Sequence, residues 1–252
     1  KGVWVAASVL HSARILRRSG VRDPNLGRHF RCHPGTATFG WYDDPVDLTQ
    51  GATQGWSSLA FRDAPGFKLE SLAIPFEMVA SRLKGGGQEL VERIGDFRHL
   101  ALWVMAVRAE TTGSIGLGPF GPWVHYTLNS ADMQRMRAAM VLLARTHFAA
   151  GARWVIPGVH GLPYRVGPDE LSILEQAPLD PRAWVGILSH LFGGCVMGAD
   201  PARSVCDPRG RVRGVDRLWV ADASLLPTTL GVNPQHTIMA LARIHAEDAL
   251  GA

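Results

Sequence analysis

Hydrophobic positions near the two ends of the chain follow one order, an apolar run and then a helical pattern. Residues 2 to 7 form a short apolar run, and a helical pattern follows from Ser8 to Arg18. A second apolar run lies at 217 to 221, and a helix is predicted from Pro234 to about Leu250. Continuous apolar runs of this kind are typical of strands buried in a parallel sheet. We therefore predict that both ends belong to an α/β layer.

The middle of the chain has a different pattern. Gly, Pro, Asp and Thr are frequent from 36 to 66, which predicts loops, and β-rich segments at 67–74, 101–109 and 124–128 predict strands. Asn129 or Ser130 can cap a helix that Gly151 ends. The predicted apolar face of this helix consists of Met133, Met136, Met140, Leu143 and His147. A long insertion between two halves of an α/β layer accounts for this order.

Composition and charge narrow the class of protein. The 252 residues are 46% hydrophobic and 19% charged, which is typical of a globular protein. The net charge of +4 comes from scattered basic residues, which argues against nucleic-acid binding. The sequence has no apolar run of the roughly 20 residues that a membrane span needs. The three cysteines, Cys32, Cys195 and Cys206, fit neither a disulfide framework nor a zinc cluster, and we expect a cytoplasmic, reducing location.

Candidate catalytic and ligand-binding residues are concentrated in the last quarter of the chain. Glycines surround a histidine in the segment His190-Leu-Phe-Gly-Gly-Cys-Val-Met-Gly198, and they allow the backbone to approach a flat ligand. Asn233-Pro234 stands immediately before a predicted helix, whose first amides favour negative charge. Taken singly, His190 is explained as a loop histidine and Asn233 as an N-cap. Their occurrence together favours a functional site.

These segments resemble the C-terminal signature of the glucose-methanol-choline (GMC) family of FAD-dependent alcohol oxidases and dehydrogenases. The resemblance rests on H-x-x-G-x-C-x-M-G from His190, LWVADASLLP at 218–227 and GVNPQHTIMALA at 231–242. Further segments match in family order: VWVAASVLHSARILRRSGV, NLGRHFRCHP, GPFGPWVHYTLNSADMQRM and FAAGARWVIP. The spelling Gly-Val-Asn-Pro at 231–234 is most similar to the cholesterol oxidase and long-chain alcohol oxidase branches.

The resemblance implies a fold and three segments. The fold is α/β, with part of a Rossmann-like FAD-binding layer and an α+β substrate domain that contains an antiparallel sheet. Residues 1–35 correspond to a returning part of the FAD-binding domain, 36–185 to the substrate-binding domain, and 186–252 to the C-terminal part of the FAD-binding domain with the catalytic motifs. The implied cofactor is FAD.

The resemblance also implies roles for individual residues. His190 is the candidate base that accepts or shares the hydroxyl proton during hydride transfer to the flavin. Asn233 would orient the substrate oxygen. Cofactor contacts are implied for Ser8, Asp222, Ala223, Asn233, Pro234 and Gln235. His236 would point away from Asn233 on a helix, and we interpret it as a residue that supports the site residues from behind or as a packing residue.

Two features depart from the family pattern. Ser8 stands where the family usually has Gly. No G-x-G-x-x-G follows a strand with an acidic residue about 20 positions further on, so the dinucleotide fingerprint is missing. We therefore expect a second chain, or an N-terminal segment, to supply the phosphate-binding loop.

The sequence indicates the substrate less clearly than it indicates the family. Trp103, Phe120 and Trp123 could line a pocket for a sterol, long-chain or polycyclic alcohol, although aromatic residues in strands are more often core. Glu70, Glu77 and Glu110 are candidates for a pocket carboxylate.

His29 and His33 have metal-like spacing around Cys32, but no metal site is expected. A non-catalytic subunit of a GMC-like complex is the alternative function. A serine hydrolase that uses Ser224 is disfavoured because no G-x-S-x-G occurs.

Overall fold

The computed structural model describes residues 1–251, which divide into two compact units. Within the described residues, unit 1 comprises Lys1–His33, Ala109–Leu128 and 188–251, and unit 2 comprises Pro34–Arg108 and Asn129–Ile187. The central domain predicted for 36–185 includes Ala109–Leu128, which in the structure groups with the chain ends in unit 1. The roles given to the predicted domains stay predictions. None of the helices in the described part of the chain combines the length and the apolar character that crossing a membrane requires.

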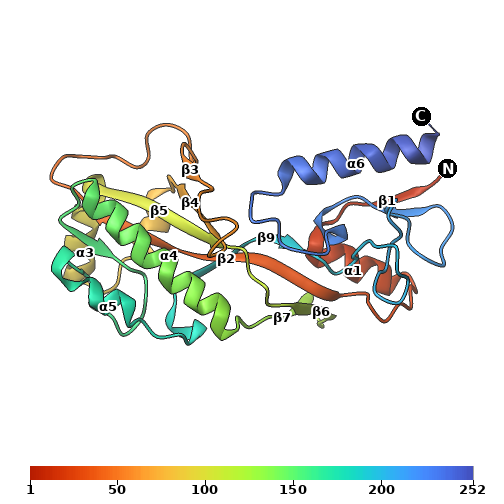
Figure 1. Ribbon diagram of the computed structural model, residues 1–252, viewed down its shortest axis with the longest axis horizontal. Coiled ribbons are helices and arrows are strands. Elements are labelled where there is room, and N and C mark those ends of the chain that lie inside the picture. Colours follow the sequence, from red (N-terminus) through yellow and green to blue (C-terminus); the bar gives the residue numbers. More distant parts are fainter. Residues whose placement is uncertain (252) are drawn as a thin grey trace. The chain divides into compact units, whose positions relative to one another are not determined.

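Unit 1 contains the two predicted strand-then-helix segments. Strand β1 (Val3–Val5) pairs in parallel with β10 (Leu218–Val220). Helix α1 (Ser8–Arg18) follows β1, and α6 (Gln235–Leu250) follows β10 after the short helical turn η4 (Ala223–Leu225). Figure 1 shows α1 and α6 beside this strand pair. The structure thus confirms the α/β arrangement predicted for both ends.

The remaining strands of unit 1 support the segments that carry the candidate site. β6 (Gly113–Leu117) and β7 (Pro122–His125) form an antiparallel hairpin. β7 begins two residues earlier than the strand predicted at 124–128 and ends three residues earlier. The first part of β2 (Arg28–Trp41) pairs with β6, and β9 (Gly186–Phe192) also pairs with β2. A buried cluster holds these elements together, with Leu191 and Ala223 against Val9, Phe30, Cys32 and Ile115.

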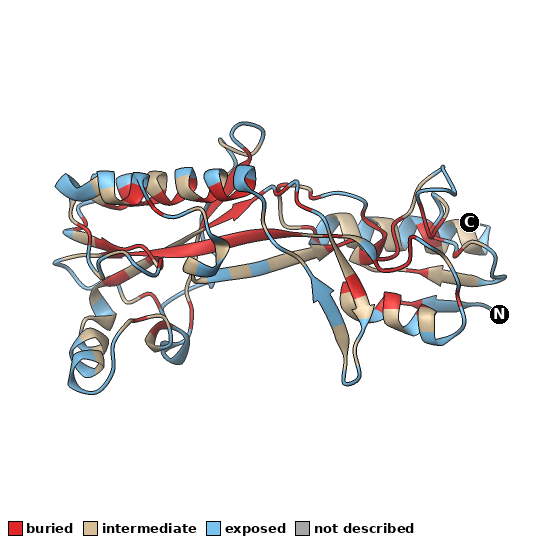
Figure 2. Cartoon of the chain, turned by 90° about the horizontal axis from the view of Figure 1, so that it is seen from below, coloured by how far each residue is buried: buried red, intermediate tan, exposed pale blue. Residues whose placement is uncertain are grey.

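Unit 2 is built on an antiparallel sheet, as expected. Its strands run in the order β3 (Ser57–Ser58), β4 (Phe67–Ser71), β5 (Leu100–Val107) and the second part of β2, which also pairs with β8 (Trp154–Ile156). The buried colouring of Figure 2 runs along β2 in this sheet. The shorter helical segments are α2 (Phe76–Ala80), α3 (Gln88–Gly95), α5 (Leu171–Glu175), η1 (Phe97–His99), η2 (Pro168–Glu170) and η3 (Pro181–Ala183).

Helix α4 (Ser130–Ala149) packs against β4 and β5 through the face that the sequence predicts. The Asn129 side chain caps it by accepting a hydrogen bond of 2.8 Å from the Asp132 N–H. All five predicted face residues are buried: Met133, Met136, Met140, Leu143 and His147. Apolar periodicity and one capping residue were therefore sufficient to place this helix.

The prediction of loops from 36 onward is wrong at its start, because β2 continues to Trp41. Its glycines are packing residues rather than turn residues. A Cβ at Gly35 would lie 1.9 Å from the Met105 carbonyl oxygen, and one at Gly40 would lie 2.3 Å from His147 Nδ1. Glycine here allows close approach within a sheet, and composition alone does not separate that use from a loop.

His147 illustrates this close packing. Its Nε2 lies 3.1 Å from the Thr38 carbonyl oxygen, and its Nδ1 lies 2.9 Å from the Tyr42 hydroxyl. The carbonyl can only accept, so Nε2 donates, and in the neutral ring Nδ1 then accepts from the Tyr42 hydroxyl. Burial lowers the pKa of His147 from 6.5 to about 4.

This pKa shift predicts a pH-dependent stability. Between pH 6.5 and about 4 the unfolded chain binds a proton at His147 that the folded chain does not, so stability falls by up to about 3 kcal/mol as the pH drops. Urea unfolding at several pH values should show this loss, and His147→Gln should flatten it. His160→Gln, at an exposed position of the same unit, is the control. An unchanged pH profile in His147→Gln would contradict the assignment.

Candidate functional site

His190 lies near the end of β9 with a left-handed backbone conformation, φ 52°. Gly193 follows at φ 80°, and a Cβ there would lie 1.9 Å from the His29 carbonyl oxygen on β2. Its N–H donates a hydrogen bond of 3.3 Å to the Ala223 carbonyl oxygen. Glycine therefore lets the end of β9 pass between β2 and η4, and this places the half-buried His190 beside β2.

The imidazole next to His190 belongs to His33, which is 1% exposed. The Nδ1 atoms of the two rings are 3.2 Å apart, and the rings meet edge to face. His33 Nε2 accepts a hydrogen bond of 3.0 Å from the Gly231 N–H. One buried side chain therefore links β2, β9 and the loop that leads to α6.

Sequence reasoning missed His33, which it treated as half of a discounted metal pair. The signal for its role was present only in the fold, because its partners lie 157 and 198 positions away in the chain. Within residues 1–251 the structure contains no cluster of three or more side chains suited to hold a metal ion.

Asn233 and its neighbours stand at the start of α6. Asn233 is half-buried and lies two residues after Gly231, Pro234 is the buried N-cap residue, and Gln235 is the exposed first residue of the helix. No side chain caps this helix. Its first amides therefore face outward from the helix end and favour a ligand with negative charge.

Asp222 joins a second group of candidate residues. Its carboxylate accepts hydrogen bonds from the Ser8 N–H (3.0 Å), the Ser12 hydroxyl (2.5 Å) and the Ser224 N–H (2.8 Å). Ser8 is exposed, and its φ of 73° is the left-handed conformation that favours glycine. Asp222 thus fixes the turn between β1 and α1 against η4, and the structure brings Ser8, Asp222 and Ala223 together.

Other reactive side chains nearby are buried. Ser224 is 0% exposed, so its hydroxyl cannot meet a substrate as a hydrolase nucleophile. Burial raises the pKa of the Cys195 thiol to about 12, which keeps it protonated and unreactive. His236, in contrast, is exposed on α6, so its interpretation as a packing residue is wrong.

The candidate pocket residues are dispersed. Phe120 is 98% exposed and Trp123 is 61% exposed, both in the β6–β7 hairpin, while Trp103 lies half-buried on β5. Glu70 is buried in an ion pair of 2.5 Å with Lys68, and Glu77 and Glu110 are exposed. These positions stay predictions for the substrate pocket.

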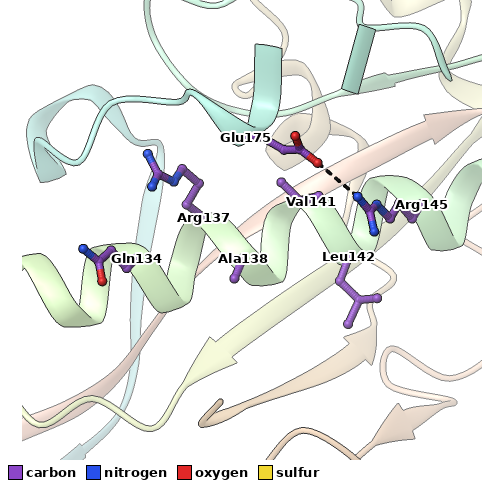
Figure 3. Close-up of a pocket in the computed structure, with 7 residues that line it drawn as sticks. All are labelled: Gln134, Arg137, Ala138, Val141, Leu142, Arg145 and Glu175. Atoms are coloured by element: carbon purple, nitrogen blue, oxygen red, sulfur yellow. Dashed lines mark hydrogen bonds and ion pairs between the residues drawn. The ribbon is translucent and has the colours of Figure 1, made fainter. Parts of the chain in front are cut away.

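A groove in unit 2 lies along the outer face of α4 (Figure 3). It encloses about 320 Å³ and is bridged at one end by an ion pair of 3.0 Å between Arg145 and Glu175. Its walls are Gln134, Arg137, Ala138, Val141, Leu142, Arg145 and Glu175. These flexible side chains contribute no histidine, cysteine or hydroxyl group, so we do not place the reaction there.

Comparison with known proteins identifies the family. The family model of GMC oxidoreductase matches residues 111–242, and the chain belongs to this family. An uncharacterized GMC-type oxidoreductase of Mycobacterium tuberculosis is 32% identical over 98% of this chain and 39% of its own length. A long-chain-alcohol oxidase of Arabidopsis thaliana is 26% identical over 94% of this chain and 35% of its own length.

A solved structure shares the fold. The crystal structure of pyridoxine 4-oxidase from Mesorbium loti superposes with a TM-score of 0.71 at 18% identity, and covers 100% of this chain and 52% of that one. The chain therefore spans between about a third and a half of the length of these proteins. The letters G-x-G-x-x-G do occur, at Gly116–Gly121, but there they form the β6–β7 hairpin rather than a turn from strand to helix.

Asp222 provides a test of how the site is held. Asp222→Asn replaces one acceptor oxygen by an amide that cannot accept from Ser8 or Ser12, so we expect a loss of about 2 kcal/mol in the free energy of unfolding. Chemical denaturation measures this loss. Asp216→Asn, at an exposed position of the same unit, should change stability by less than about 0.5 kcal/mol. Equal stability of the two variants would contradict the anchoring role.

Proposed function

We propose that this chain forms the C-terminal part of an FAD-dependent oxidoreductase that oxidises a bulky apolar alcohol to a carbonyl compound. Membership of the GMC family supports the reaction class, and the Arabidopsis relative named a long-chain-alcohol oxidase supports the substrate class. The observation that carries the proposal is the hydrogen-bonded link from Gly231 through His33 to His190. It ties the candidate base to the segment that bears Asn233.

The residues of unit 1 suit part of the cofactor. The start of α6 lacks a side-chain cap, which suits the negative charge of a reduced flavin or of a phosphate. At the start of α1 the Ser8 N–H already donates to the Asp222 carboxylate. Ser8, Asp222, Ala223, Asn233, Pro234 and Gln235 are the residues that would hold it. When bound, FAD supplies the acceptor for the hydride that leaves the carbinol carbon.

The chain's own side chains then have two tasks at the substrate oxygen. His190 accepts or shares the hydroxyl proton, because histidine is the side chain that most often serves as a general base. Asn233 does not titrate, so its carboxamide orients the oxygen and stabilises the charge that develops there. Both residues lie in unit 1, on segments joined by the His33 link.

The proposal includes a partner and a location. A second chain or an N-terminal segment supplies the dinucleotide-binding loop, because the one G-x-G-x-x-G of this sequence lies in a hairpin. The relatives, which are two to three times as long, are consistent with such an addition. We propose a cytoplasmic location from the buried thiols of Cys195 and Cys206.

Anaerobic stopped-flow spectroscopy tests the function. FAD-loaded protein that includes the dinucleotide-binding portion is mixed with a long-chain alcohol, and loss of the oxidised-flavin absorbance is followed. His190→Ala should slow flavin reduction by about 10² to 10⁴-fold, and Asn233→Ala by about 10² to 10³-fold. His125→Ala, at an exposed position on β7, is the control and should reduce flavin at the wild-type rate.

Two outcomes would contradict the proposal. A wild-type protein that binds FAD but shows no reduction by long-chain or sterol alcohols would favour the non-catalytic subunit. Variants at His190 and Asn233 that reduce flavin as fast as wild type would place the chemistry elsewhere.

A further inference from the structure

The hydrogen bonds around His33 determine where its proton lies. A backbone N–H can only donate, so the hydrogen bond from Gly231 requires a lone pair on His33 Nε2. A neutral imidazole with an unprotonated Nε2 carries its proton on Nδ1. His33 is 1% exposed and also packs edge to face against Phe192, 5.1 Å between ring centres, so its ring is fixed in this orientation.

The same reasoning extends to His190. The Nδ1–H of His33 points to His190 Nδ1, 3.2 Å away, so His190 Nδ1 must accept. Neutral His190 then carries its proton on Nε2. The reverse arrangement, with Nδ1–H of His190 donating to His33, would require two lone pairs on the His33 ring, which only an imidazolate provides.

We propose that His33 is a positioning residue that sets the tautomer of His190, and that the backbone amide of Gly231 sets the tautomer of His33. In the resting protein His190 presents Nε2–H, a donor, to the substrate oxygen. This inference rests on the proposed function for its catalytic meaning, whereas the tautomer itself follows from the contacts alone.

A second contact explains how His190 could become a base. To take a hydroxyl proton at Nε2, neutral His190 must first release its Nε2 proton to water and take one from water at Nδ1, which the half-buried ring allows. The new Nδ1–H then needs an acceptor other than His33. The Ser189 hydroxyl lies 3.5 Å from His190 Nδ1 and 3.4 Å from the His33 carbonyl oxygen, to which it can donate. In the base-competent tautomer Ser189 therefore accepts a hydrogen bond from the Nδ1–H of His190. In the resting tautomer the unprotonated Nδ1 of His190 instead accepts from His33.

Nuclear magnetic resonance of isotope-labelled histidine in the FAD-loaded protein tests the resting tautomer. Long-range proton–nitrogen spectra distinguish a protonated from an unprotonated ring nitrogen, and loss of one ring's signals in His190→Ala assigns them. We expect wild-type His190 to show a protonated Nε2 and an unprotonated Nδ1. A wild-type spectrum with the proton on Nδ1 would overturn the proposal, without any need for a folded variant at His33.

Variants separate tautomer control from simple packing. His33→Phe fills the space but cannot donate, so His190 should show a mixture of tautomers, whereas in His33→Asn the amide can still donate and should preserve the wild-type pattern. His29→Asn, on the same strand, is the control. A wild-type His190 pattern in His33→Phe would show that His33 does not set the tautomer.

Ser189 has a separate readout. Ser189→Ala should keep the resting spectrum of wild type but slow flavin reduction by about tenfold, the factor expected for the loss of one hydrogen bond. An unchanged rate would remove Ser189 from the proposal. Because the spectra require no turnover, they hold even if no alcohol reduces the flavin, and the two proposals can fail independently.

Discussion

The candidate site depends on one hydrogen bond from a backbone amide to a buried imidazole. His33 is almost completely inaccessible, and a buried polar ring destabilises a protein unless its nitrogens have partners. Gly231 and His190 supply those partners from segments far away in the sequence. The orientation of His190 is therefore a property of the folded unit 1, and no local segment could produce it alone.

A second polar anchor lies close to the first. Asp222 collects donors from the β1–α1 turn and from η4, and the Ala223 carbonyl oxygen accepts from the Gly193 N–H at the end of β9. This last bond connects the Asp222 group with the strand that carries His190. Both groups thus rest on the same small buried cluster, which includes Leu191 and Ala223.

Local patterns were sufficient for the elements whose signals are local. The strand-then-helix order at both ends, the cap at Asn129 and the buried face of α4 could all be predicted from periodicity and capping chemistry. The long strand β2 could not, because Pro34, Gly35 and Gly40 resemble loop residues. The close approach of Met105 and His147 that favours Gly35 and Gly40 is visible only in the packed sheet.

Some features of the candidate site could likewise be predicted from the sequence, and others are visible only in the structure. Sequence motifs suggest His190, Asn233 and Asp222 as candidates, and these roles stay predictions. The motifs gave no indication that His33 links the segments of His190 and Asn233. The G-x-G-x-x-G motif at Gly116–Gly121 is a related case. This motif indicates a phosphate-binding loop only where it joins a strand to a helix, and here it lies in a β-hairpin. Candidate site residues that belong to one short motif can be recognised in the sequence. Contacts between side chains far apart in the sequence, such as His33 and His190, can be recognised only in the folded structure.

The central claim is that His190 and Asn233 act on one substrate oxygen beside a flavin. The most direct measurement is an experimental structure of the complete, FAD-loaded protein with an unreactive analogue of a long-chain alcohol. The account predicts that the analogue's oxygen lies about 2.6 to 3.2 Å from both His190 Nε2 and the Asn233 carboxamide. An analogue bound beside the flavin with either side chain turned away from its oxygen would contradict it.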